Sequence, residues 1–173
     1  DDVRYTCFEG ETGLMAYIPE ILVEDYNKSD LLIYLWNGSI IRGFGSERPD
    51  KLRGPQHHNV WAEEVSSWQN AKNTWSNMKF GHRLGELPRL VWTTTPKPVP
   101  IIKQLSKAAD NKKHYMVLGS TYENKRNLSE SFYEEVAQYE GTKLGRQELE
   151  GELIDPEEDG IVMRSQWQLW PAK

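Results

Sequence analysis

From residue 60 onward, short apolar runs alternate with helical patterns, and this order constrains the fold more than any other feature of the sequence. Runs typical of strands occupy 60–62, 88–96 and 114–121, and helical patterns occupy 68–81, 101–109, the stretch after Asn127, and 142–153. An alternation of strand and helix implies right-handed crossovers and a parallel sheet. We therefore expect an α/β fold with a mostly parallel sheet flanked by helices.

A β-hairpin is predicted ahead of this alternation. In LLIYLWNGSIIRGFG (31–45), two β-rich runs flank Asn37-Gly38, the pair preferred in two-residue hairpin turns. The polar loop 46–59, which carries Gly54-Pro55, then leads into the run Val60-Trp61-Ala62, which we expect to be a buried strand.

Helix boundaries are predicted from apolar stripes and from capping residues. The stripe of the first helix is Trp68, Ala71, Trp75 and Met78, with Gly81 as its stop. Asn127 is predicted to cap a later helix, because Glu130 follows three residues on, as in a capping box.

Composition excludes several classes of protein. The 173 residues suffice for one domain, and 21 basic against 26 acidic residues give a net charge of -5, with no overall attraction to nucleic acid. The single cysteine excludes an internal disulfide and fits a reducing compartment, and the four histidines show no zinc-site spacing. No apolar run approaches the roughly 18 residues of a membrane span, and no signal peptide is visible.

Two polar motifs follow predicted parallel strands. Glu63-Glu64 comes directly after 60–62, and Thr93-Thr94-Thr95 comes after the run Leu90-Val91-Trp92. Ligands bind at the carboxyl ends of such strands. An apolar strand ending in two acids is typical of the second nucleotide motif of P-loop ATPases, in which the first acid binds Mg²⁺ and the second polarises the attacking water. The alternative is a strand end whose charges simply face water.

Threonine hydroxyls and a loop arginine fit the same chemistry. The hydroxyls of residues 93–95 can hydrogen-bond a phosphate or its attacking water, although threonine is also common in strands. Arg53 lies 11 residues before Glu64 (64 minus 53), and a loop arginine can stabilise the transition state of phosphoryl transfer. The alternative for Arg53 is an ordinary surface charge.

The phosphate-loop motif G-x-x-x-x-G-K-[ST] is absent from the 173 residues, as are G-x-S-x-G and any Ser-His-Asp pattern. The acidic run 148–159 is expected to be a solvated helix end that leads into a linker.

Three stretches together resemble the large terminase subunit of tailed bacteriophages. They are SERPDKLRGPQHHNVWAEEVSSW (46–68), FGHRLGELPRLVWTTTPKP (80–98) and GSTYENKRNLSESFYEEVAQYEGTKLGRQELEGEL (119–153). The segment FEGETGLMAYIP (8–19) and Trp36-Asn37-Gly38 fit the same family. The resemblance covers nearly the whole chain, in order.

The resemblance implies a P-loop NTPase-like three-layer sandwich that uses ATP and Mg²⁺ to drive viral DNA into a procapsid. It places the Walker B motif on 60–64, with Glu63 on the magnesium side and Glu64 as the catalytic acid. The family usually has aspartate where this chain has Glu63. The resemblance also identifies Thr93, Thr94 and Thr95 as the coupling motif, and Arg53 as a finger that acts across a ring of subunits in some members.

The same resemblance implies a domain plan and a set of partners. Residues 1–153 correspond to a partial ATPase domain, and residues 154–173 to a linker toward a C-terminal nuclease domain that cuts concatemeric DNA. The phosphate loop is expected upstream of Asp1, so the 173-residue chain alone is expected to be inactive. Expected partners are double-stranded viral DNA, the portal protein, the small terminase subunit and further copies in a ring, in the host cytoplasm at the procapsid portal.

Two other functions are open at this point. The first is a non-catalytic α/β remnant that binds DNA or a protein partner, which the missing phosphate loop favours. The second, weaker one is carbohydrate binding, prompted by the seven tryptophans. Because Trp61, Trp75 and Trp92 fall where apolar core is expected, this second alternative has little support.

Overall fold

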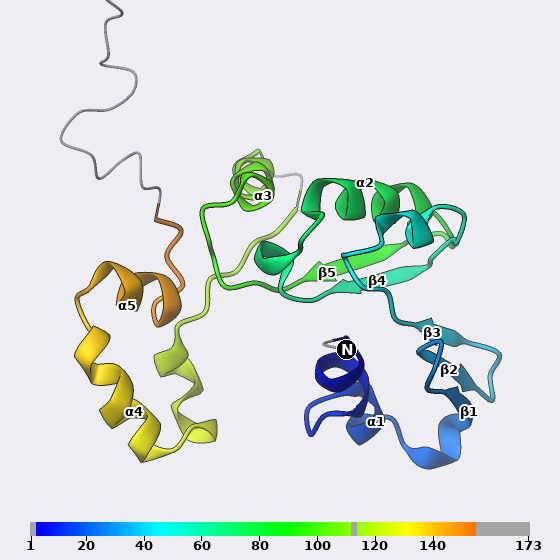
Figure 1. Cartoon of the computed structure of the whole chain (residues 1–173), viewed down its shortest axis with the longest axis horizontal. Coiled ribbons are helices and arrows are strands. Elements are labelled where there is room, and N and C mark those ends of the chain that lie inside the picture. The colour runs from blue at the N-terminus through cyan, green and yellow to red at the C-terminus, as the bar shows by residue number, and fades with distance from the viewer. Residues whose placement is uncertain (1–2, 112–113, 155–173) are drawn as a thin grey trace, which may run out of the picture. The chain divides into compact units, whose positions relative to one another are not determined.

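The computed structural model describes residues 3–111 and 114–154, which form two compact units (Figure 1). Of the described residues, the first unit contains 3–63 and 67–92, and the second contains 64–66, 93–111 and 114–154. The predicted linker beyond residue 154 lies outside the described residues.

The first unit contains a three-stranded antiparallel sheet in the order β1-β2-β3. Its strands are β1 (Val23–Asn27), β2 (Leu32–Leu35) and β3 (Ile40–Arg42). Ile33, on the central strand, has no exposed surface and anchors the sheet. The sequence did not predict β1, because its residues VEDYN include two acids with low β-propensity and the strand depends on pairing with β2.

The hairpin of β2 and β3 is confirmed, but its turn is longer than predicted. Leu35 N–H donates to Ser39 O at 2.9 Å, and Gly38 N–H donates to Leu35 O at 2.8 Å, so three residues connect the paired positions. Gly38 is left-handed (φ 81°), whereas Asn37 is not. A two-residue type I′ turn needs positive φ at both central residues, which Asn37 does not have. A three-residue connection that ends in a left-handed glycine needs positive φ at the glycine alone, as observed at Gly38.

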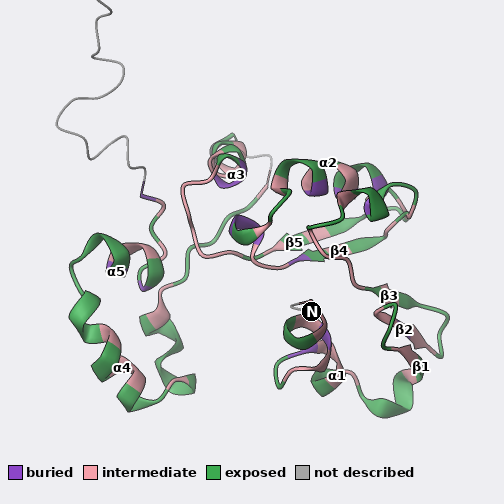
Figure 2. Cartoon of the chain, viewed as in Figure 1, coloured by how far each residue is buried: buried purple, intermediate pink, exposed green. Residues whose placement is uncertain are grey.

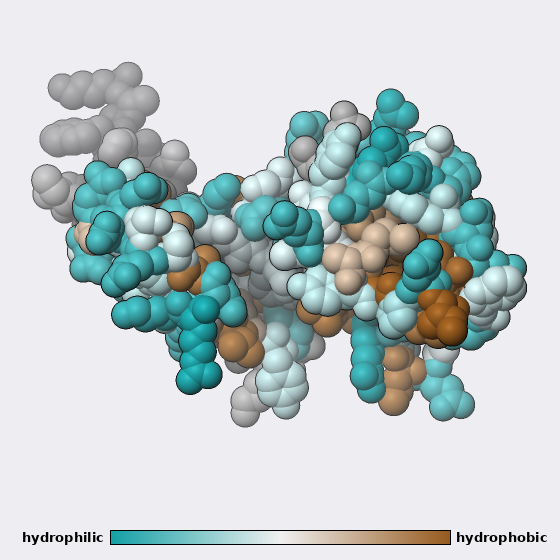
Figure 3. Space-filling model, turned by 90° about the horizontal axis from the view of Figure 1, so that it is seen from below, coloured by the Kyte–Doolittle hydropathy of each residue, from teal (hydrophilic) through white to brown (hydrophobic). Residues whose placement is uncertain are grey.

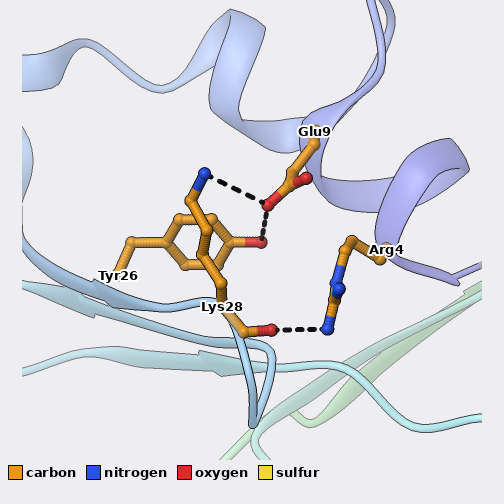
Figure 4. A network of polar contacts seen from close by, with 4 residues as sticks. All are labelled: Arg4, Glu9, Tyr26 and Lys28. Atoms are coloured by element: carbon orange, nitrogen blue, oxygen red, sulfur yellow. Dashed lines mark hydrogen bonds and ion pairs between the residues drawn. The ribbon is translucent and has the colours of Figure 1, made fainter. Parts of the chain in front are cut away.

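A network of polar contacts attaches the N-terminal helical segment Val3–Glu9 to β1 (Figure 4). Tyr26 O–H donates to Glu9 at 3.1 Å, and Lys28 Nζ lies 3.8 Å from the same carboxylate oxygen. Arg4 donates to the backbone oxygen of Lys28 at 2.9 Å. The sequence between this segment and β1 forms α1 (Leu14–Tyr17) and a 3₁₀ turn, Glu20–Leu22.

The parallel pairing predicted from the alternation is confirmed for two strands. β4 (Asn59–Ala62) pairs in parallel with β5 (Arg89–Trp92), with Ala62 opposite Trp92. α2 (Ala71–Gly81) lies between them in sequence and starts three residues later than predicted. Its Thr74 hydroxyl donates to Ser46 O at 3.0 Å, which fixes the helix to the loop before the 3₁₀ turn Pro49–Leu52.

The predicted core position of Trp61 is wrong. Trp61 is 47% exposed and Val91, opposite it in the parallel pair, is 61% exposed. Side chains of one strand point alternately to the two faces of the sheet, and the paired residues Trp61 and Val91 point to the same face. The described residues leave this face open. Trp75 and Trp92 are half-buried. In the view of Figure 3, brown apolar side chains lie among teal polar ones.

The second unit consists of helices joined by extended segments, and many of its residues are exposed to solvent (Figure 2). α3 (Pro100–Asp110) buries Ile101, Ile102 and Leu105. The chain continues through the 3₁₀ segment Thr121–Asn127, α4 (Glu130–Val136), the 3₁₀ turn Ala137–Tyr139 and α5 (Lys143–Glu148). In the described parts of both units, no helix is long and apolar enough to cross a membrane.

The strand predicted at 114–121 is wrong. This segment pairs with no strand among the residues that the structure describes, and Tyr115 and Val117 are 100% and 89% exposed. An apolar, β-branched run fits a pleated surface, but only pairing with a neighbour makes it a strand. Within the described residues the chain is therefore mixed α/β, with one small parallel and one small antiparallel sheet.

The predicted caps of the later helices also differ from the observed ones. Ser129, not Asn127, caps α4, with its hydroxyl accepting from Phe132 N–H at 3.2 Å. A capping box does occur nearby, but Ser120 and Glu123 form it at the start of the 3₁₀ segment. α5 ends at Glu148 and is shorter than the predicted 142–153.

Candidate active site around Glu64

The site begins where the two parallel strands end. β4 and β5 stop in register at Ala62 and Trp92, and the acidic pair and the triple threonine are the residues that follow them in the chain. Both motifs therefore follow carboxyl ends of paired parallel strands, as predicted from the sequence.

Glu64 leaves the extended conformation of the strand. Its φ of 48° is left-handed, which is uncommon for a residue other than glycine, asparagine or aspartate. The next residue, Val65, is fully buried and donates its N–H to Thr93 O at 3.2 Å. This bond holds residues 64–66 beside 93–95, and the 3₁₀ turn Val65–Ser67 follows at once.

The carboxylate of Glu64 accepts hydrogen bonds from three residues. Oε1 lies 2.9 Å from Ser66 Oγ, 3.3 Å from Thr95 N and 3.4 Å from Thr94 Oγ1, and Oε2 lies 3.3 Å from Thr95 N. Two of these three residues belong to the triple threonine, so the structure brings Glu64 and that motif together.

The Thr94 hydroxyl is shared among neighbours. It accepts from Ser66 N–H at 2.9 Å, and its single proton lies within reach of Thr95 O at 3.0 Å or Glu64 Oε1 at 3.4 Å. Thr93 contributes its backbone oxygen, which accepts from Val65. The residues 64–66 and 93–95 thus form a continuous hydrogen-bonded cluster.

Sequence reasoning missed Ser66. This residue is only 9% exposed and contacts both Glu64 and Thr94. The available signal was a small hydroxyl residue two positions after the second acid, which is weak because serine is common in helical turns and caps.

Glu63 has different surroundings and belongs to the first unit. Its side chain is half-buried, and its backbone oxygen accepts from the Trp68 indole N–H at 2.9 Å. Burial, and secondarily the charge of Glu63, raise the pKa of the Cys7 thiol. The two acids therefore have different partners, and the left-handed backbone of Glu64 departs from the extended conformation of β4.

Arg53 also belongs to the first unit, in an exposed loop. It follows the 3₁₀ turn Pro49–Leu52, and Gly54 after it is left-handed (φ 108°). Its guanidinium lies 4.0 Å from Asp50, and both side chains are largely exposed (73% and 88%), so this ion pair holds the arginine only weakly.

The acids can be compared with what a magnesium site requires. Among residues 3–111 and 114–154, no three His, Cys, Asp or Glu side chains cluster into a ready metal site. Mg²⁺, however, is usually held by one or two carboxylates together with substrate phosphates and water. A half-buried glutamate at the end of a parallel strand fits that role, so Glu63 can supply the protein ligand.

Together, the strands and the cluster define a mixed α/β protein with an acidic site after two parallel strands. Residues 3–168 match the family described as terminase large subunit, T4likevirus-type, N-terminal. This match covers most of the 173 residues, and the chain belongs to that family. A comparison with curated proteins found no match.

Proposed function

We propose that this chain is part of the ATPase motor of a phage terminase large subunit, which couples ATP hydrolysis to movement of viral DNA into the procapsid. The hydrogen bonding of Glu64 to Thr94 and Thr95 is the observation that carries the proposal. A catalytic acid bonded to a neighbouring loop gives a direct physical path from hydrolysis to movement. Membership of the terminase family supports the same role in packaging.

Glu64 acts as the general base. Within the described part of the chain, Ser66 and Thr94 contact Oε1, and Oε2 accepts from Thr95 N–H alone, at 3.3 Å. A carboxylate oxygen has two lone pairs, so Oε2 retains the capacity to accept a proton from a water molecule. When bound, Mg-ATP supplies the phosphoryl group and the charge that offsets the transition state.

The coupling motif responds to Glu64 through the Thr94 hydroxyl. When Glu64 changes position, the Thr94 hydroxyl can donate its hydrogen bond to Thr95 O, 3.0 Å away, in place of Glu64. The cluster therefore has two satisfied arrangements, which is what a two-state mechanical element requires.

The remaining roles form part of the same proposal. Glu63 holds Mg²⁺, and Arg53 acts on the nucleotide of a neighbouring copy in a ring. The parallel pair β4–β5 belongs to a P-loop NTPase-like sandwich whose phosphate loop is supplied outside these 173 residues. The assembled motor works in the host cytoplasm at the procapsid portal, with double-stranded DNA, the portal protein, the small subunit and a nuclease domain.

Replacing the two acids separately tests the proposal in the full-length gene product that contains this chain. Glu64→Gln keeps the size and polarity of the side chain but removes the base, so turnover should fall at least about 100-fold with Mg-ATP binding retained. Glu63→Gln should instead raise the magnesium concentration required for turnover. ATP turnover and nucleotide binding across a magnesium titration measure both effects.

Near-normal turnover in Glu64→Gln, or rescue of its defect by added magnesium, would contradict the assignment. An unmutated protein that binds DNA or a protein partner without hydrolysing ATP would support the alternative of a non-catalytic module.

A further inference from the structure

Ser66 is the residue that joins the acid to the coupling threonine. Its hydroxyl donates to Glu64 Oε1 at 2.9 Å, the shortest contact to that carboxylate, and its backbone N–H donates to Thr94 Oγ1 at 2.9 Å. The other contacts to Glu64 measure 3.3 Å and 3.4 Å. A hydrogen bond to a charged acceptor is stronger when it is shorter, so the Ser66 hydroxyl contributes most to holding Oε1.

The burial of Ser66 makes this contact specific. Ser66 is 9% exposed and follows the fully buried Val65 in a 3₁₀ turn, so its side chain has little contact with water. The Thr94 proton, in contrast, has a closer acceptor in Thr95 O than in Glu64. Ser66 therefore still holds Glu64 in the arrangement in which Thr94 has turned away.

We propose that Ser66 is a positioning residue for Glu64: it fixes Oε1 so that Oε2 faces the water to be activated. This inference rests on the proposed ATPase function. Ser66 touches neither nucleotide nor water in this scheme and acts through the carboxylate alone.

The test compares Ser66→Ala with the wild type in the full-length gene product. The substitution removes the hydroxyl and leaves the backbone bond to Thr94 in place. We expect kcat for ATP to fall about ten-fold or more, since a hydrogen bond to a charged group is lost, while KM and the magnesium requirement stay unchanged. Ser66→Thr, which restores a hydroxyl, should recover most of the rate. Ser76→Ala, in which the lost hydroxyl is an exposed one on α2, is the matched control and should retain full activity.

A double-mutant cycle separates positioning from a general structural role. In a Glu64→Gln background the carboxylate is already gone, so Ser66→Ala should cost little further activity. A kcat within two-fold of wild type for Ser66→Ala, an equal loss in both backgrounds, or a loss in KM alone would overturn the inference.

If the wild-type protein shows no ATP turnover, the proposed function fails, and the contact itself remains testable in the 173-residue chain. Thermal unfolding of Glu64→Ala, Ser66→Ala and the double variant should then give non-additive shifts of the midpoint. Additive shifts would show that Ser66 does not hold Glu64.

Discussion

His57 shows how a single residue links local burial to pH-dependent stability. The backbone N–H of His57 donates to Gly81 O at 2.8 Å, and His57 forms an isolated parallel β-bridge with His82. The ring lies edge-on to Phe44 (centroids 5.8 Å apart), and its buried Nε2 has no hydrogen-bond partner among the described residues. Burial, followed by the nearby His82 and Arg42, lowers the pKa of His57 below its ordinary 6.5.

Protonation of His57 should therefore oppose folding. The unfolded chain binds this proton below about pH 6.5, whereas the folded chain resists it, so the stabilisation is complete above that pH and is lost as the pH falls toward the lowered folded value. We expect the unfolding midpoint to fall more between pH 7 and pH 5 in wild type than in His57→Gln. Chemical denaturation at each pH measures this, and His58→Gln controls for loss of an imidazole. If the unfolding midpoints of wild type and His57→Gln fall equally between pH 7 and pH 5, the mechanism is excluded.

At the scale of helices and strands, the sequence predicted those elements that depend on the local order of apolar and turn residues. Asn37-Gly38 between β-rich runs predicted the β2–β3 hairpin, and apolar runs on either side of a helical stripe predicted the parallel pair β4–β5. The rule that ligand sites follow such strands then placed Glu64 near the threonines. The strand at 114–121 failed because strand pairing depends on neighbours far along the chain, which the pattern of one segment does not specify.

Capping failed for a related reason, since several hydroxyl and amide residues compete for each helix start. Ser120 caps the 3₁₀ segment because its hydroxyl makes two contacts. It accepts from Tyr122 N–H at 3.1 Å and donates to Leu149 O at 3.1 Å. The second bond ties the 3₁₀ segment Thr121–Asn127 to the end of α5.

Ser120→Ala should therefore destabilise the second unit by about 1–2 kcal/mol, from the lost cap and the lost bond to Leu149. Asn127→Ala is the matched control, because the amide of Asn127 donates to the exposed Asn124 side chain and caps no helix; its cost should stay below about 0.5 kcal/mol. Urea unfolding compares the two. Equal losses would mean that the Ser120 cap adds nothing.

At the scale of the whole molecule, the site residues are divided between the two units. Glu64 and the triple threonine belong to one unit, and Arg53 belongs to the other, where its guanidinium is weakly paired. Under the proposed function, we expect this exposed loop arginine to act on a nucleotide bound by another copy.

Arg53→Ala in the full-length product should lower the turnover of assembled rings by roughly 10³–10⁵-fold, the range for arginine fingers. Mixing Arg53→Ala subunits with Glu64→Gln subunits should restore part of the activity, since an intact Glu64 then meets an intact Arg53 from its neighbour. Lys51→Ala, an exposed change in the same segment, is the control. Action in trans is excluded if mixed rings never exceed either variant alone and isolated monomers lose their basal turnover on Arg53→Ala.

The left-handed backbone at Glu64 bears on which amino acids the position can hold. A side chain at φ 48° costs roughly 1–2 kcal/mol relative to glycine, and asparagine or aspartate tolerates it better than glutamate does. That cost is similar in size to what the carboxylate gains from its hydrogen bonds. Folding stability alone therefore gives glutamate no clear advantage over glycine at this position. Under the proposed function, what favours glutamate here is the need for a carboxylate long enough to reach Thr95 N–H while Oε2 keeps a lone pair for water.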